Sequence, residues 1–177
     1  MSDSLSNQFL GLLNVAPLLR IRRNHGLEHA TLNLLSMRFP GCPLAGYSDL
    51  NGFWIVGEIS TEDMESIVKE ARRRLQDGER GLAVHPNCGT NFVVAGVLAG
   101  SVAAGAMFGA GRRFREKVGR IPLAITLATL ALVLAQPLEL LLQERVTTTG
   151  ELGSLEVVEI VPRHIGSLKV HRITTLS

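Results

Sequence analysis

The strongest constraint on the fold is a pair of long apolar runs in the second half of the chain. Residues 92–110 (FVVAGVLAGSVAAGAMFGA) contain no charged side chain over 19 positions. A helix needs about 20 such residues to cross a hydrocarbon core of about 30 Å. Residues 121–142 (IPLAITLATLALVLAQPLELLL) form a second run. We therefore predict an integral membrane protein whose residues 92–142 form a transmembrane helical hairpin. The alternative for the first run is a buried helix of a soluble domain.

The charged residues around these runs predict the orientation of the hairpin in the membrane and the kinds of partner that the protein binds. The segment 111–120 (GRRFREKVGR) carries five basic residues, so the positive-inside rule predicts a cytoplasmic loop with both termini outside. We expect a multi-pass membrane protein, with the lipid bilayer as a partner. The net charge of +2, with basic residues spread along the chain, argues against nucleic acid as a partner.

Small residues in the first apolar run predict a further partner. Gly96 and Gly100, and then Gly105 and Gly109, are spaced four residues apart. In lipid, small residues at this spacing let a neighbouring helix approach closely. We expect a partner transmembrane helix or a second copy of the chain to pack there.

The polar parts predict an α+β fold. We expect an interfacial or packing helix in residues 1–23, which ends in Arg20, Arg22 and Arg23, and a polar α+β domain in residues 24–91. A β tail in residues 143–177 follows the hairpin and completes a small sheet.

Within the polar domain, Asn24 is the predicted cap of a helix that ends near Phe39. Asn51-Gly52 predicts a β-hairpin in residues 44–59. Ser60 or Thr61 then begins an amphipathic helix. The remaining predicted elements are strands at residues 82–84, 155–161 and 168–173.

Two short stretches carry candidate chemistry, and the first is HGLEH at residues 25–29. On a helix, His25 and His29 project from one face and can bind one metal ion. Glu28 shares that face with His25 and can act as a general base on a metal-bound water, in the inverted zincin spacing. The alternative is a helix surface that happens to hold two histidines.

The second stretch is HPNCGTN at residues 85–91, directly before the first apolar run. His85 and Cys88 are both good zinc ligands, so the two stretches together predict a zinc site. The alternative is a turn in which Cys88 is a small buried residue. A disulfide between Cys42 and Cys88 is a rival if both face an oxidising compartment. His164 and His171 have no partners at ligand spacing, and we expect them on the surface.

The two stretches HGLEHA and HPNCGTNFVVAG together resemble the YqhQ-like bacterial membrane proteins, which have no known function and are described as predicted metal-dependent enzymes. The segment PLELLLQERVTTTGELGSLEVVEI resembles a later part of the same family, and the resemblance covers residues 24–161. This chain is shorter, and Ala30 and Asn87 stand where a basic residue is common, so it could instead belong to a smaller sister family. The resemblance implies a metal-dependent protein whose functional residues are His25, Glu28, His29, His85 and Cys88.

Three functions are compatible with these features. The first is a membrane-anchored zinc hydrolase acting at the bilayer surface, in which His25, His29 and either His85 or Cys88 hold zinc and Glu28 is the base. The second is a closed, structural zinc site that uses all four of these ligands. The third is an accessory subunit of a membrane complex, recruited through the glycine-rich helix.

Overall fold

The computed structural model describes residue 11, residues 13–111 and residues 113–177. Residues 1–10 and 12 of the stretch that we predicted as an interfacial or packing helix lie outside the described residues. The chain divides into two compact units. The polar unit consists of Met1–His85 and Gln143–Ser177, and the hairpin unit consists of Pro86–Leu142.

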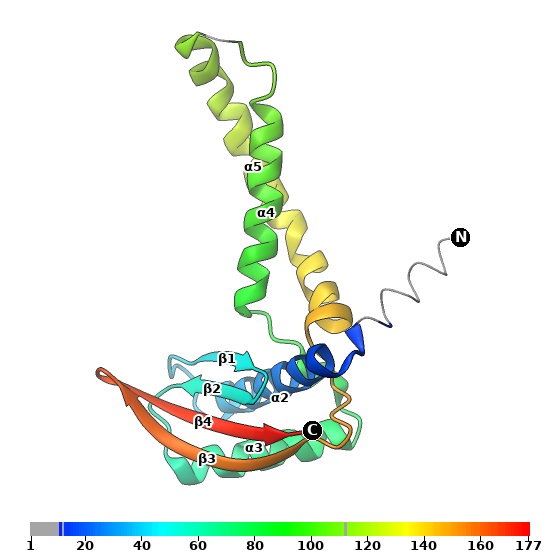
Figure 1. The fold of residues 1–177 in the computed structure, drawn as a ribbon. Helices are drawn as coiled ribbons and strands as arrows, with labels where there is room; N and C mark the ends of the chain where they lie inside the picture. The colour runs from blue at the N-terminus through cyan, green and yellow to red at the C-terminus, as the bar shows by residue number, and fades with distance from the viewer. Residues whose placement is uncertain (1–10, 12, 112) are drawn as a thin grey trace. The chain divides into compact units, whose positions relative to one another are not determined.

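The polar unit contains a four-stranded antiparallel sheet with the strand order β1-β2-β4-β3 (Figure 1). Strand β4, from near the end of the chain, lies between β2 and β3, as Phe53 opposite Ile173 illustrates. The strands are β1 (Ala45–Asp49), β2 (Gly52–Val56), β3 (Glu156–Ile165) and β4 (Leu168–Leu176). The mixed helical and antiparallel architecture agrees with the predicted α+β class.

The predicted hairpin is the β1–β2 pair. Its turn is stabilised by the Asp49 side chain, whose Oδ1 accepts a hydrogen bond from the Asn51 backbone N–H at 2.7 Å. Gly52 adopts φ +138°, and a Cβ there would collide with the carbonyl oxygen of Ile173. Only glycine fits this position, because it needs both the unusual backbone angle and the space.

Helix α2 (Ala16–Arg38) is one continuous helix of 23 residues, so it begins well before residue 24. The prediction that Asn24 caps a helix is wrong. Asn24 is fully buried within α2, its amide donates to the Asp49 carbonyl at 2.8 Å, and its Oδ1 accepts from the Thr175 hydroxyl at 2.6 Å. A residue type that favours caps serves here to tie the helix to the sheet.

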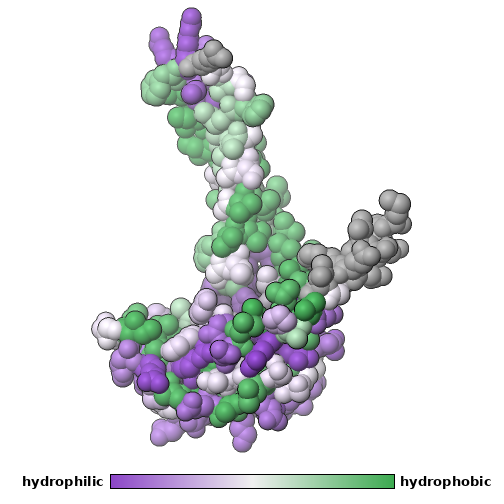
Figure 2. Space-filling model, viewed as in Figure 1, coloured by the Kyte–Doolittle hydropathy of each residue, from purple (hydrophilic) through white to green (hydrophobic). Residues whose placement is uncertain are grey.

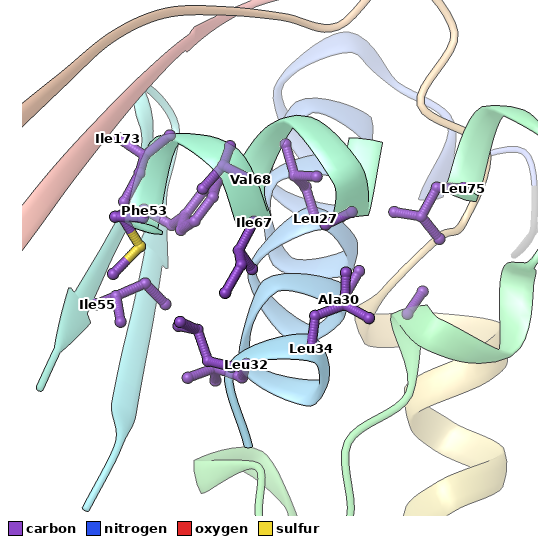
Figure 3. Close-up of a cluster of buried hydrophobic side chains, with 14 of the residues drawn as sticks. Leu27, Ala30, Leu32, Leu34, Phe53, Ile55, Ile67, Val68, Leu75 and Ile173 are labelled. Carbon is purple, nitrogen blue, oxygen red and sulfur yellow. The ribbon is translucent and has the colours of Figure 1, made fainter. Parts of the chain in front are cut away.

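Helix α3 (Thr61–Gln76) begins as predicted, with the Ser60 hydroxyl accepting a hydrogen bond from the Asp63 N–H at 3.0 Å. The core lies between the sheet and the two helices, and Figure 3 shows Leu27 and Leu34 of α2 on one side and Phe53 of the sheet on another. The predicted apolar stripe of α3 is buried in this core: Met64, Ile67, Val68, Ala71 and Leu75.

Two further predictions in the polar unit are wrong. Residues 82–84 do not form a strand, because most of this segment belongs to a 3₁₀ helix, η1 (Arg80–Ala83). His171 is not on the surface but fully buried on β4, where its Nε2 lies 3.2 Å from the Thr61 hydroxyl. His164 is exposed as expected.

The hairpin unit consists of α4 (Gly89–Ala106) and α5 (Phe114–Leu142). Both helices are long and apolar enough to cross a membrane. Figure 2 shows predominantly hydrophobic colouring along much of the hairpin. Helix α4 begins three residues before the predicted span and ends four residues earlier, and α5 begins within the predicted loop. Gly109 therefore lies beyond α4, with φ +72°, and is not part of a helical glycine face.

After α5 the chain forms a short π-helix, η2 (Gln143–Thr147), which belongs to the polar unit. Gln143 is buried, and the backbone N–H and hydroxyl of Thr148 both donate to the Gln143 carbonyl at 2.9 Å. Single π-helical turns are rare and often occur at functional sites.

Candidate metal centre

The first part of the site is the histidine pair on α2. His25 and His29 are one turn apart, and their ring centroids lie 4.3 Å from each other at an interplanar angle of 61°. His29 is almost fully buried, whereas His25 is half-buried. The spacing in HGLEH thus brings the two imidazoles together, as the sequence predicts.

Both imidazoles are oriented by backbone carbonyl oxygens. The Nδ1 of His25 lies 3.1 Å from the Thr147 carbonyl oxygen, and the Nδ1 of His29 lies 2.9 Å from the Ala83 carbonyl oxygen. A carbonyl oxygen only accepts, so each Nδ1 carries a proton, and in the neutral imidazole each Nε2 then carries the lone pair. Metal-binding histidines are commonly fixed in this way, with one ring nitrogen donating to the protein and the other facing the metal.

His85 is the third imidazole in the polar unit. Its ring centroid lies 5.8 Å from that of His29, and its backbone N–H donates to Gln143 Oε1 at 3.0 Å. Burial, and then the neighbouring His29, lower the pKa of His85. The neutral form, which is the form that binds metal, is therefore favoured.

The segment before His85 is held on α2 by Asn33. The Asn33 amide donates to the carbonyl oxygens of Leu82 and Val84, at 3.0 Å and 2.9 Å. The Ala83 carbonyl between them accepts from His29. Three successive carbonyls of this segment are thus bound by side chains of α2, which fixes where the chain enters the second stretch.

Cys88, the fourth predicted ligand, belongs to the hairpin unit, and its role as a ligand stays a prediction. Cys88 is buried and occupies the N-cap position of α4, and its Sγ lies 2.9 Å from the Thr90 hydroxyl. No disulfide forms between Cys42 and Cys88 in the described chain.

Glu28 is the third functional residue predicted in HGLEH. The residue is 3% exposed, and its carboxylate accepts a hydrogen bond from the Ser48 hydroxyl of β1. Gly46, also on β1, makes room for it, because a Cβ there would overlap the Glu28 carboxylate. Burial raises the pKa of Glu28, and the Ser48 hydrogen bond and the charge of His25 oppose that shift.

Gly26, between the histidines, allows the segment after α5 to approach α2. A Cβ at Gly26 would overlap the Thr149 carbonyl oxygen and lie 3.0 Å from its carbonyl carbon. The Thr149 N–H in turn donates to the Arg22 carbonyl at 3.2 Å. This close approach places Thr147 beside His25, and the sequence alone assigned Gly26 no role.

The arrangement has the chemistry of a transition-metal site. Two imidazoles oriented by backbone carbonyls offer nitrogen ligands, which suit zinc and several other metals alike. The supporting residues Gly46, Ser48, Asn33, Gln143 and Thr147 were not identified from the sequence. Of these, only Gln143 and Thr147 lie in the segment PLELLLQERVTTTGELGSLEVVEI, which resembles a part of the YqhQ-like proteins.

The fold and this site define a class of protein: an α+β unit with a pair of neighbouring histidines that could bind a metal, in a chain that also contains two helices apolar enough to cross a membrane. Residues 20–160 match the family described as Domain of unknown function (DUF6391), and the chain belongs to that family. The matched region includes both histidine stretches and both apolar helices.

The chain is also similar to an uncharacterised protein of Picosynechococcus sp. (strain ATCC 27264 / PCC 7002 / PR-6). The two are 34% identical over 157 residues, which cover 77% of each chain. No solved structure matches. A family of unknown function, as predicted, is confirmed, and the particular resemblance to the YqhQ-like proteins stays a prediction.

Proposed function

We propose that this protein is a membrane-anchored metal-dependent hydrolase, with zinc as the metal, that acts at the bilayer surface. The observation that carries the proposal is the paired orientation of His25 and His29. Each donates Nδ1–H to a backbone carbonyl, which leaves two Nε2 lone pairs as ligands on one helix face. The location we propose is the bacterial inner membrane, with α4 and α5 as the spans, and the YqhQ-like resemblance favours the same assignment.

In the catalytic arrangement, His25, His29 and either His85 or Cys88 would hold the metal. A metal held there would supply an activated water and polarise a carbonyl group. Glu28 is the candidate base, because its carboxylate is held in the same turn of α2 and is fixed by Ser48. The substrate would be an amide or ester of a peptide or lipid met at the bilayer surface.

A closed structural site is the second candidate, and the presence of Cys88, a good zinc ligand, in the second stretch favours it. If His25, His29, His85 and Cys88 all bind one ion, the tetrahedral shell is complete and no position is left for water. Glu28 and Ser48 would then stabilise α2 against β1 without taking part in a reaction.

Metal analysis of detergent-purified full-length protein tests the site itself. We expect about one zinc ion per chain, in proportion to a single site, with loss in His25→Ala and His29→Ala and retention in Glu28→Gln. His164→Ala is the matched control, because His164 is exposed on β3. Wild-type protein without stoichiometric metal, purified without chelator, would refute the metal centre.

Cobalt substitution distinguishes the open site from the closed one. Co²⁺ bound by four protein ligands that include a thiolate shows a sulfur-to-metal charge-transfer band, and Cys88→Ser should abolish that band. The spectrum of such a closed site does not change with pH. A site with bound water instead gives a spectrum that changes as the water ionises. If the site is open, Glu28→Gln should keep the metal and lose hydrolysis of acylated chromogenic esters and amides. Full activity in that variant would rule out Glu28 as the base.

A role as an accessory subunit has one observation in its favour. A Cβ added at Gly96, Gly100 or Gly105 would meet no atom within 4 Å, so within the described residues these glycines do not contact α5. Their open surface is available to a partner helix or to a second copy of the chain, and such assembly is compatible with either form of the metal site.

A further inference from the structure

Arg20, Arg22 and Arg23, near the start of α2, donate to backbone carbonyl oxygens and, among the described side chains, not to carboxylates. Arg20 Nη2 donates to the Thr175 carbonyl at 3.2 Å, and Arg23 Nε donates to the Glu151 carbonyl at 3.3 Å. Among the residues that the structure describes, Arg20, Arg22 and Arg23 form no ion pair with a carboxylate. The backbone orients these side chains, but it does not neutralise their charges.

Arg22 is the most constrained of the three. Its Nη2 donates to the carbonyl oxygens of Arg145 and Thr148, at 3.2 Å and 3.1 Å. Its Nη1 reaches the Leu13 carbonyl at 3.4 Å and Asn14 Oδ1 at 3.3 Å. Its Nε is buried and has no hydrogen-bond partner within the described part of the chain. A guanidinium remains charged at neutral pH, so a fixed cation is held here by neutral acceptors only.

A cavity of about 420 Å³ lies beside these side chains, lined by Asn14, Leu19, Arg22, Arg23, Thr149 and Glu151. Its single carboxylate, that of Glu151, forms an ion pair with Arg80 at 2.9 Å and is therefore engaged elsewhere. Arginine side chains bind phosphate oxygens well, because a guanidinium can donate two parallel hydrogen bonds. The cavity has the charge and the donors of a phosphate site.

Chain connectivity places Arg22 close to the end of the second apolar helix. Arg22 donates to the carbonyl oxygen of Arg145. Arg145 follows Leu142, the last residue of α5, by three residues, and three residues span at most about 10 Å. If α5 crosses the membrane, this guanidinium lies at the depth of the lipid headgroups. The first turn of α2 adds exposed apolar side chains: Val15 is 48% exposed and Leu18 is 45% exposed.

We propose that the pocket formed by Arg22 and Arg23 binds the phosphate of an anionic phospholipid headgroup. The proposal rests on the membrane placement of α5 but not on the metal site. A lipid suits the pocket better than free phosphate does, because Val15 and Leu18 beside the arginines can contact the apolar part of a lipid. Free phosphate would leave that surface exposed to water.

Native mass spectrometry of the detergent-solubilised full chain tests this, with phosphatidylglycerol, phosphatidylcholine and inorganic phosphate as probes. We expect one phosphatidylglycerol to be retained per chain in preference to phosphatidylcholine. Arg22→Gln and Arg23→Gln should each weaken its binding about fivefold, and the double variant about 25-fold, from the typical contribution of a basic residue near an anionic membrane surface. Arg163→Gln, the same change at an exposed position of β3, should leave binding unchanged.

Arg22 also donates to the backbone carbonyls of Leu13, Arg145 and Thr148. Arg23→Gln therefore serves as the variant that leaves those contacts intact. Equal retention of the two lipids, retention of phosphatidylglycerol by the double variant, or equally tight binding of inorganic phosphate would each overturn the lipid assignment. Wild-type protein that stays in solution after detergent removal would instead overturn the membrane placement, and the lipid assignment with it. The bound metal, measured on the same samples, reports separately on the site proposed above.

Discussion

Gly26→Ala is the substitution whose effect follows most directly from the structure. The new methyl group would overlap the Thr149 carbonyl oxygen and lie 3.0 Å from its carbonyl carbon. Both atoms are backbone, so the segment around Thr149 has to move by roughly 1 Å to restore ordinary contact distances. That movement weakens the hydrogen bond from the Thr149 N–H to the Arg22 carbonyl and the one that orients His25.

Two opposing contributions set the expected magnitude for Gly26→Ala. Alanine favours the helix interior over glycine by about 1 kcal/mol, whereas overpacking of this kind costs typically about 1–3 kcal/mol. We expect a net loss of about 0–2 kcal/mol in the free energy of unfolding. Metal affinity should fall about 10- to 100-fold, as is usual when a group that orients a ligand is disturbed.

The assay is chelator competition for the bound metal, together with denaturant unfolding in detergent. Gly81→Ala is the matched control, because a Cβ at Gly81 meets no atom within 4 Å and Gly81 does not have a positive φ. Gly26→Ala protein with wild-type metal affinity and wild-type stability would show that the approach of residues 147–149 to α2 does not support the site.

Three further predictions follow from other contacts. Asn33→Ala leaves the Leu82 and Val84 carbonyls without their donor, so it should lower the free energy of unfolding by about 1–3 kcal/mol; an unchanged melting temperature would contradict this. Burial, and then the charge of Lys169, lower the pKa of His171 in the folded protein. The contribution of neutral His171 to stability is therefore fully present above the unfolded pKa of about 6.5. This contribution is lost as the pH falls from about 6.5 through the folded pKa. His171→Leu should remove this part of the pH dependence of unfolding, and an identical dependence in the variant would count against it. Gly100→Ile should reduce the oligomer mass in analytical ultracentrifugation without destabilising the hairpin. Gly119→Ile, also at an open position, should leave the oligomer mass unchanged. Equal masses for the two variants would argue against assembly through α4.

Much of the fold follows from local patterns in the sequence. The stripe of α3, the Ser60 cap and the Asn51-Gly52 turn depend on residues close to one another in the chain, and these predictions are confirmed. Asn24 was misassigned because cap preference is a local property, whereas its observed partners, Asp49 and Thr175, are distant in sequence. The predicted strand at residues 82–84 is wrong for a related reason: its carbonyls are bound by α2 side chains instead of a neighbouring strand.

In the candidate site, too, contacts between residues close in sequence could be predicted, whereas contacts between distant residues could not. The pairing of His25 with His29 follows from helical spacing, so the sequence could predict it. The orientation of these rings could not be predicted, because Thr147 lies 122 residues from His25 and Ala83 lies 54 residues from His29. The position of Glu28 depends on Ser48 and on the missing side chain of Gly46, which no pattern within HGLEH reveals.

The order of the strands has a consequence for the synthesis of the protein. Strand β4 lies inside the sheet, between β2 and β3, and the carbonyl that orients His25 also comes from the segment after α5. A ribosome therefore completes both apolar helices before it supplies the residues that close the sheet and fix the first histidine. Folding of the polar unit must wait for the hairpin to be made, so a metal bound by His25 as proposed would be loaded only after both apolar helices have been synthesised.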